Sequence, residues 1–173
     1  MAGTRRWLEK SVIGLNLCPF AAAPYRDQRV YLCVTEQRTA AGLLEVLCSE
    51  LLDLQAMDPM HRETTLLIHP WALTDFAEYN AYLDVCEAAV RQLGLEGEMQ
   101  VASFHPHYQF ADTEPEDMEN FTNRSPYPML HLLREASVER AIAAVGDTTD
   151  IYKRNIRTLR ELGLAGWNSL WRG

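Results

Sequence analysis

The sequence lacks several features that mark common classes of protein. Apolar runs are short, such as Thr65 to Ile68, and fall far below the roughly 18 residues that cross a bilayer. Positive charge is scarce, since 16 Lys and Arg stand against 24 Asp and Glu and leave a formal net charge of −8. Binding to nucleic acid or to an anionic membrane needs a cationic surface. We therefore expect no nucleic-acid partner and no membrane partner.

Several motifs of common enzymes are also missing. The sequence contains no Walker lysine loop, no GxGxxG, no GxSxG and no HExxH, which removes the commonest nucleotide-dependent, serine-hydrolase and zinc-protease mechanisms. Its four cysteines form no CxxC pair, which argues against a zinc ribbon or a thioredoxin-like site. The first ten residues carry charge without an apolar segment behind them. We therefore expect a cytoplasmic protein with reduced thiols.

What is present is the composition of an ordinary globular protein. The 173 residues are 47% hydrophobic and 23% charged. A chain of this length buries enough surface to fold without disulfides or metal ions. We expect residues 1–173 to form a single globular α/β domain.

Strand and helix patterns alternate through the first hundred residues. Runs rich in β-branched and aromatic residues predict strands at 29–35, 64–69 and 98–104. Helical periodicity at 40–56 and 75–93 predicts the crossovers that join parallel neighbours. Further helices are predicted at 4–15, 127–135, 137–145 and 148–162. The fold class is therefore α/β: a three-layer domain with a small, mostly parallel sheet and a helical C-terminal part.

Two of the predicted strands end in histidine. The carboxyl ends of parallel strands meet at one edge of the sheet, where ligands bind, and His69 and His105 lie at such ends. His105 and His107 form an HxH pair that can aim two rings at one point, and imidazole suits zinc, iron, copper or nickel. We expect a divalent transition metal such as zinc, held by His69, His105 and His107. The alternative is that these histidines only pack or cap the strand ends.

Cys18 differs from the other thiols because it lies in a turn before a proline, where a thiol can be presented. A histidine close to it would remove its proton and make it a nucleophile. Cys18 and His105 are therefore the candidate catalytic residues, with a packing role for Cys18 as the alternative. Asn16 is a candidate substrate-binding amide. His131 falls within the predicted helix 127–135, and we expect it to be structural.

The residues before that helix have the character of an anion site. Ser125 is a suitable N-cap, and the free N–H groups of a helix N-terminus attract anions. Arg124 beside it would reinforce the binding of a carboxylate or phosphate. A plain cap next to a surface arginine is the alternative. Asn155 lies on the apolar side of the last helix, so we expect its amide to bind the long loop or the substrate.

Residues 105–128 form a long segment rich in proline and aromatic residues, without a regular period. Segments of this kind are usually functional or disordered. We expect an enzyme that acts on a small anionic molecule at a His/Cys site, by metal-assisted hydrolysis or lyase chemistry. Two alternatives stay open: a Cys18-dependent thiol enzyme, and a non-catalytic binding or adaptor protein that uses loop 105–128. A protein partner is therefore not excluded.

Four segments carry a resemblance to a known family: Gly14-Leu-Asn-Leu-Cys-Pro-Phe, Phe104-His-Pro-His-Tyr-Gln-Phe, Asn123-Arg-Ser-Pro-Tyr-Pro-Met and Asn155-Ile-Arg-Thr-Leu. Together they resemble an uncharacterised bacterial family known as domain of unknown function fourteen-fifteen. The resemblance covers nearly the whole chain and implies a stand-alone domain. It implies no particular activity, cofactor or catalytic residue.

Overall fold

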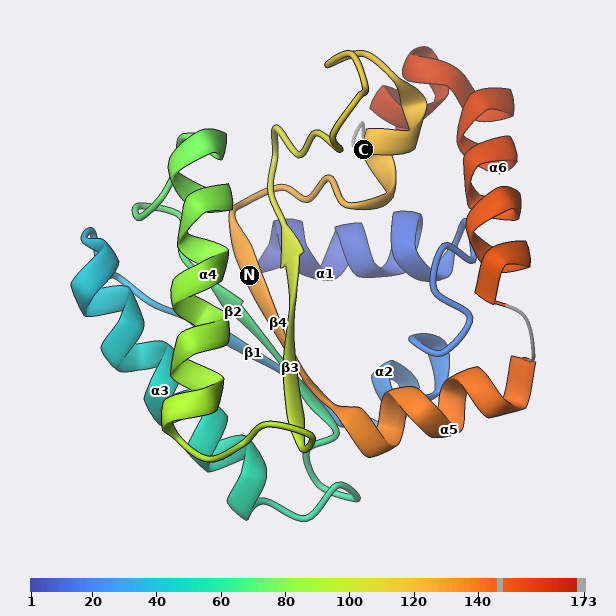
Figure 1. Ribbon diagram of the computed structural model, residues 1–173. Helices are drawn as coiled ribbons and strands as arrows, with labels where there is room; N and C mark the ends of the chain where they lie inside the picture. The colour runs from blue at the N-terminus through green and yellow to red at the C-terminus, as the bar shows by residue number, and fades with distance from the viewer. Residues whose placement is uncertain (146–147, 171–173) are drawn as a thin grey trace.

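The computed structural model, which describes residues 1–145 and 148–170, is built around a four-stranded sheet (Figure 1). The strands are β1 (Val30–Val34), β2 (Thr64–Ile68), β3 (Met99–Phe104) and β4 (Met129–Arg134), in the spatial order β1-β2-β4-β3. β1 pairs with β2 in parallel, whereas β4 is antiparallel to both β2 and β3. The sheet is therefore mixed, and the prediction of a mostly parallel sheet was wrong.

The difference comes from β4, where the sequence analysis predicted a helix at 127–135. Leu130 and Leu132 pack in the core on one face, whereas Met129 and His131 face the opposite layer. This alternation is that of a strand covered on both faces. Leu, Met and Arg favour helices locally, but insertion between β2 and β3 pairs the backbone N–H and C=O groups on both edges. Tertiary pairing outweighs local propensity here.

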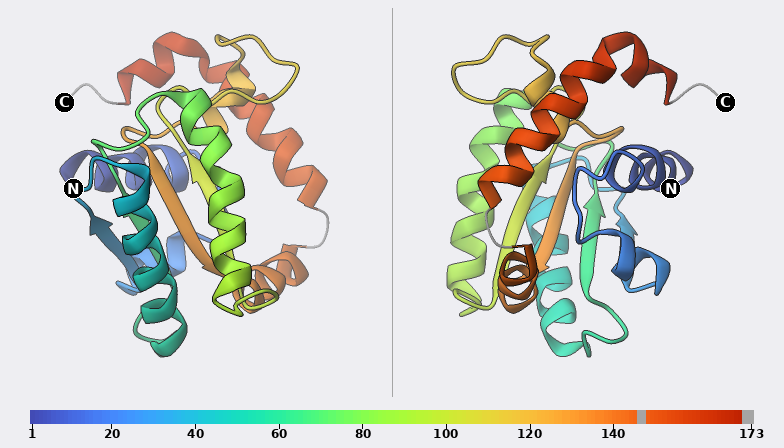
Figure 2. Two further views of the ribbon diagram at one scale, coloured as in Figure 1. Left: turned by 60° about the vertical axis from the view of Figure 1, so that its left-hand side comes forward. Right: turned by 90° about the vertical axis from the view of Figure 1, so that its right-hand side faces the viewer.

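One face of the sheet is covered by α3 (Ala40–Ala56) and α4 (Phe76–Gln92), which lie side by side (Figure 2). Both helices begin at a side-chain cap. The hydroxyl of Thr39 accepts the N–H of Gly42 at 3.1 Å, and the carboxylate of Asp75 accepts the N–H of Glu78 at 3.0 Å. These two predicted helices are confirmed. Leucines dominate the core beneath them: Leu43, Leu47, Leu51, Leu54, Leu67, Leu130 and Leu132.

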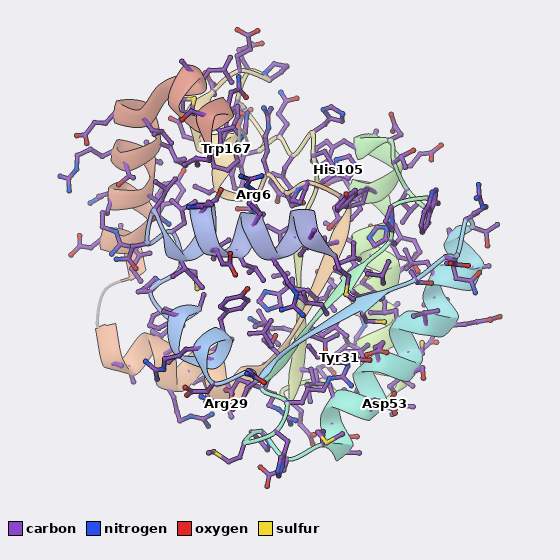
Figure 3. The ribbon with its side chains drawn as sticks, turned by 180° about the vertical axis from the view of Figure 1, so that it is seen from behind. Arg6, Arg29, Tyr31, Asp53, His105 and Trp167 are labelled. Carbon is purple, nitrogen blue, oxygen red and sulfur yellow. The ribbon has the colours of Figure 1, made fainter. Side chains whose placement is uncertain are left out.

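The opposite face carries the N-terminal helices and α5. The helix α1 (Ala2–Trp7) continues into the π-helix η1 (Leu8–Ile13), which confirms the helix predicted at 4–15, and the short α2 (Ala22–Arg26) follows. Trp7 and Leu8 pack on Leu66, Ile68 and Met129 of the sheet. Figure 3 shows α1 crossing this face. Since α5 (Glu135–Val145) also lines a hollow on this side, the sheet lies between two helical layers.

The long segment between β3 and β4 is folded around one buried amide. Asn120 is fully buried, and its Oδ1 accepts hydrogen bonds from the Phe110 N–H and the Thr113 hydroxyl, both at 2.9 Å. Its Nδ2 donates to the Glu114 carbonyl at 2.7 Å. These bonds give the irregular backbone the partners that a strand or helix would otherwise provide.

The last helix, α6 (Thr148–Ser169), packs against η2 (Met118–Thr122), a short 3-10 helix within the long segment. Leu159 and Trp167 of α6 form a separate cluster there with Leu17 and Phe121. Gly163, with φ 63° and ψ 173°, is not helical, so the first helical stretch ends at the predicted position 162 and a second stretch follows across this kink. Within the described ranges, no helix is both long and apolar enough to cross a membrane.

Candidate ligand-binding pocket

Of the three histidines predicted as metal ligands, His69 and His105 are held by backbone carbonyls. His105 is fully buried, whereas His107 is exposed. The Nε2 of His105 donates to the Leu73 carbonyl at 3.3 Å, and its Nδ1 accepts the backbone N–H of His107 at 3.1 Å. A metal ligand or a general base needs a free lone pair on nitrogen. His105 therefore has no nitrogen free for either predicted role.

His69 is also fixed inside the fold. Its Nδ1 donates to the Ala72 carbonyl at 2.9 Å, and its ring stacks on Tyr79 with centroids 5.9 Å apart. Burial lowers the pKa of His69 to about 4, so this ring is uncharged at neutral pH. Across the part of the chain that the structure describes, no three His, Cys, Asp or Glu side chains are placed to hold a metal ion. The geometry does not support the predicted zinc site of His69, His105 and His107.

The predicted anion site loses its helix, because β4 follows Ser125. The Ser125 hydroxyl donates to the Tyr127 carbonyl at 2.6 Å, so it caps no helix. Ser125, Arg124 and His107 do come together, since all three line an open hollow of about 320 Å³ that also contacts α6. The structure thus gathers these residues without the backbone N–H groups that were expected to bind an anion.

Arg124 is used mainly to hold the long segment in place. Its guanidinium donates to the Tyr108 carbonyl at 3.3 Å and to the Pro115 carbonyl. The guanidinium carbon also lies 4.1 Å from the centre of the Phe121 ring, a cation–π contact. These three contacts account for most of the side chain, so we assign Arg124 a structural role.

The two predicted substrate amides lie where α6 meets the N-terminal turn. The Nδ2 of Asn155, which is buried, donates to the Leu17 carbonyl at 2.7 Å. Asn16 has a left-handed backbone with φ 53°, and its carbonyl accepts a hydrogen bond from Arg154 at 2.6 Å. The buried amide has the partner that its burial requires, but this partner is a backbone carbonyl. Neither asparagine lines the pocket described next.

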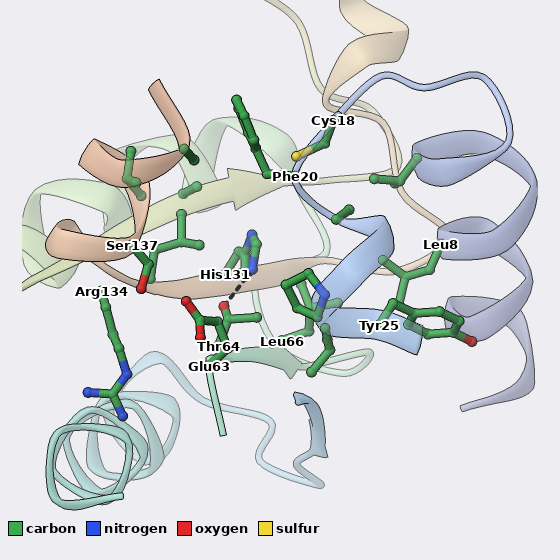
Figure 4. Close-up of a pocket in the computed structure, with 18 of the residues that line it drawn as sticks. Leu8, Cys18, Phe20, Tyr25, Glu63, Thr64, Leu66, His131, Arg134 and Ser137 are labelled. Atoms are coloured by element: carbon green, nitrogen blue, oxygen red, sulfur yellow. Dashed lines mark hydrogen bonds between the residues drawn. The ribbon is translucent and has the colours of Figure 1, made fainter. Parts of the chain in front are cut away.

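A pocket of about 340 Å³ lies between the sheet and the second helical layer (Figure 4). Strands supply its floor, because every second residue of β3 and β4 faces this side. The walls come from α1, η1, the turn at 18–21, α2 and α5. The apolar side chains that line it include Trp7, Leu8, Val12, Phe20, Tyr25, Leu66, Ala102, Phe104, Leu133, Val138 and Ile142.

Cys18 and His131 both line this pocket, and Figure 4 shows both side chains pointing into it. Cys18 was predicted as a nucleophile beside His105, but the histidine that lines the same pocket as Cys18 is His131. Sequence reasoning missed His131 because a helix at 127–135 gave its side chain no distinctive position. Once residues 129–134 are known to form a strand, the alternation of Met129, His131 and Leu133 places the imidazole on the pocket face.

Burial keeps both groups uncharged at neutral pH. It raises the pKa of the Cys18 thiol, against the smaller opposing effect of the N–H groups of Phe20 and Ala21. It lowers the pKa of His131 to about 4. Reactive cysteines instead have depressed thiol pKa values in electropositive surroundings. The pair therefore rests as a neutral thiol and a neutral imidazole, suited to binding neutral molecules.

Further polar groups lie at one end of the pocket. Glu63 is paired with Arg29 at 2.7 Å and with Arg140 at 3.7 Å. The Nε2 of His131 lies 2.7 Å from the hydroxyl oxygen of Thr64. The side-chain amide of Gln100 lines the same end and bonds to none of the described residues. A few polar groups thus converge on a space that is otherwise apolar, the usual composition of a small-molecule site.

The fold and the pocket define an α/β protein with a mixed four-stranded sheet and a pocket lined mainly by apolar side chains. The chain belongs to the family described as protein of unknown function (DUF1415), whose model matches residues 1–169. This match confirms the family resemblance carried by the four sequence segments. No curated protein and no solved structure matches the chain.

Proposed function

We propose that this protein binds a small, neutral and mostly apolar molecule in the pocket beside His131. The observation that carries the proposal is the apolar hollow of about 340 Å³ on the α1 side of the sheet. Ligand pockets of roughly 300–1,000 Å³ with mainly apolar linings are typical of small-molecule sites. An apolar cavity of about 150 Å³ takes up benzene. A space of roughly twice that size fits a bicyclic ring or a chain of similar volume.

This proposal replaces the small anionic substrate that the sequence suggested. Among the described residues that line the pocket, Arg134 carries the guanidinium, and one of its terminal nitrogens donates to the Leu54, Met57 and Arg62 carbonyls. The Glu63 carboxylate at the same end already pairs with Arg29 and Arg140, so these two guanidinium groups are not free to bind an anion. An anion would lose its hydration here without gaining a free cation, which is costly. The pocket favours an uncharged ligand, and within the described residues no three His, Cys, Asp or Glu side chains are placed to hold a metal ion.

A thiol enzyme is a second candidate, because Cys18 lines the same pocket as His131. A ligand with an electrophilic carbon would meet the thiol directly, and the neutral imidazole would be the acceptor for its proton. The raised pKa of Cys18 opposes this reaction. Binding without covalent chemistry is therefore the function that the site supports best.

The binding proposal is tested by titrating the protein with N-phenyl-1-naphthylamine, a neutral dye that fluoresces in apolar surroundings. Ala102 lines the pocket floor from β3, so Ala102→Leu fills part of the space. Ala77 is exposed on α4, and Ala77→Leu is the matched control. We expect saturable binding of one dye per chain, weakened about tenfold or more by Ala102→Leu, since the loss of a good apolar fit is worth roughly 1–3 kcal/mol. Ala77→Leu should leave it unchanged.

Denaturant unfolding of both variants establishes that each is folded. Ala102→Leu adds apolar volume to open space, so its stability should match or exceed that of the unchanged protein. Dye binding that is absent, or that is equally strong in both variants, would refute a ligand site in this pocket.

A further inference from the structure

We propose that the ligand donates a hydrogen bond to Nδ1 of His131, which makes it a neutral molecule with a hydroxyl or N–H group, most simply a phenol of one or two rings. Ethers, ketones and carboxylates lack such a donor. This inference rests on the proposed pocket function. It adds that, in one hydrogen bond within the pocket, the ligand donates and His131 accepts.

The hydrogen bonds of Thr64 determine which ring nitrogen of His131 carries the proton. The Thr64 hydroxyl lies 2.5 Å from the Leu132 carbonyl, which can only accept, so its single proton points there. The same hydroxyl oxygen lies 2.7 Å from Nε2 of His131. With its own proton committed, this oxygen accepts a hydrogen bond from the ring. The Nε2 of His131 therefore carries the proton, and Nδ1 is a bare acceptor.

The Nδ1 of His131 needs a hydrogen-bond donor when a ligand fills the pocket. The described residues give this nitrogen no hydrogen bond, and the ring points into the pocket (Figure 4). Phe104, whose ring centre is 6.1 Å from that of His131, is the aromatic neighbour on β3. An acceptor in such surroundings loses hydration when an apolar ligand displaces water. A ligand O–H or N–H restores the missing bond, whereas an ether or ketone oxygen places a second acceptor against the first.

The walls of the pocket favour an aromatic ligand. The rings of Trp7, Phe20 and Phe104 line the pocket together with aliphatic side chains. Aromatic rings pack edge-to-face or offset against such walls and gain energy beyond area burial. A phenol also stays neutral at pH 7, because its pKa is about 10. A rigid aromatic alcohol thus meets the shape, the charge and the donor requirement at once.

The test is to titrate 2-naphthol and 2-methoxynaphthalene by calorimetry, because the methyl ether keeps the rings and removes only the donor. Phenol and anisole form a second, smaller pair. We expect the unchanged protein to bind the hydroxyl compound of a pair about tenfold or more tightly than its ether, because the ether leaves the Nδ1 acceptor without a hydrogen bond. In His131→Phe the two compounds should bind equally, and the ether should lose no affinity.

Thr64→Val provides a second variant that keeps the imidazole. Without the Thr64 oxygen, Nε2 no longer needs the proton, and the ring can present either a donor or an acceptor to the pocket. We expect the preference for the hydroxyl compound to shrink severalfold, as the other tautomer pairs with the ether. A full preference retained in Thr64→Val would contradict the proton position argued above.

Nitrogen-15 NMR of the His131 ring tests the tautomer without any ligand. We expect a proton on Nε2 and none on Nδ1 at neutral pH, and the reverse assignment overturns the inference. Equal binding of naphthol and its ether also overturns it, as does failure of naphthol to bind a protein that still binds the dye. In each case the dye result for Ala102→Leu separately decides the proposed function.

Discussion

His131 and Cys18 show how the surroundings of a residue set its chemistry. Both types are reactive in water-exposed sites, but both lie here in an apolar pocket that favours their uncharged forms. The surroundings of His105 also limit its chemistry, since its two nitrogens are bound to the Leu73 carbonyl and the His107 N–H. Residue type and sequence spacing identified candidates, but burial and hydrogen bonding decided which nitrogen was free.

We predict that the Cys18 thiol alkylates slowly at neutral pH. Burial raises its pKa, so little thiolate is present, and thiolate is the reactive form. Peptide mass spectrometry after timed iodoacetamide treatment should show slower modification of Cys18 than of a free cysteine peptide. The rate should climb as the pH is raised, and saturating 2-naphthol should lower it. Rapid alkylation at pH 7 would instead favour the thiol enzyme.

At the scale of secondary-structure elements, sequence patterns within one element were sufficient to predict α3 and α4, whose local preferences agree with the tertiary structure. The predicted bounds of α3 were reproduced, and α4 began at its Asp75 cap, because leucine periodicity and capping residues both act within one helix. β4 could not be predicted in this way. Its strand state depends on β2 and β3, which lie more than 20 residues away in the sequence.

The hydroxyl of Tyr79 shows how the elements fix β4 in place. It donates to the Met129 carbonyl at 2.7 Å and accepts the Phe104 N–H at 3.0 Å. Met129 begins β4, and Phe104, its partner in the sheet register, ends β3. A side chain of α4 thereby joins the two strand ends from which the pocket floor starts.

We predict that neighbouring leucines of β4 differ sharply in their importance. Leu132 is fully buried in the core under α3 and α4, whereas Leu133 faces the pocket and is only partly buried. Leu132→Ala should lower the free energy of unfolding by about 2–5 kcal/mol, as is usual for a core leucine. Leu133→Ala should cost clearly less, because it enlarges an existing hollow.

Urea unfolding followed by circular dichroism measures both variants. Equal losses for Leu132→Ala and Leu133→Ala would contradict the alternation on which the pocket position of His131 depends. The same comparison therefore checks the strand and the orientation of the candidate site together.

At the scale of the whole molecule, the candidate pocket lies on one face of the sheet, whereas the sequence predicted a site at the edge of the sheet. The candidate functional residues were predicted at the edge where the carboxyl ends of parallel strands meet. The strand ends do meet, because β2 and β3 are both antiparallel to β4 and therefore run in the same direction. His69 and His105 accordingly both pack on Tyr79 at this edge, but backbone groups occupy both nitrogens of His105. The pocket depends on α1, the turn at 18–21 and α5 covering one face. No sequence pattern within a single element contains that arrangement.

We predict that stability falls as the pH drops from about 6.5 to 4. His69 is fully buried and His131 is half-buried on the pocket face, and loss of hydration lowers the pKa of each from 6.5 to about 4. Between these values the unfolded chain binds more protons than the folded one, so acidification favours unfolding, and the effect levels off below pH 4. Each histidine contributes about 3 kcal/mol to this loss, from 1.36 kcal/mol per pKa unit.

Urea unfolding at pH 7 and at pH 4 measures the effect. In His131→Phe the difference between the two free energies of unfolding should shrink by about 3 kcal/mol. The exposed Ala77 supplies the control, since Ala77→Leu removes no titratable group and should leave the difference unchanged. A variant His131→Phe with the full pH dependence would show that this imidazole titrates normally in the folded protein.

The most direct test of the central claim is a methyl NMR titration of the protein with 2-naphthol. The account predicts saturable shifts in the pocket methyl groups of Val12, Leu66 and Leu133, together with a shift of His131 Nδ1. Methyl groups of Leu43 and Leu47, on the other face of the sheet, should stay unmoved. Shifts that are absent, or that appear at Leu43 and Leu47 without the pocket residues, would contradict a ligand site beside His131.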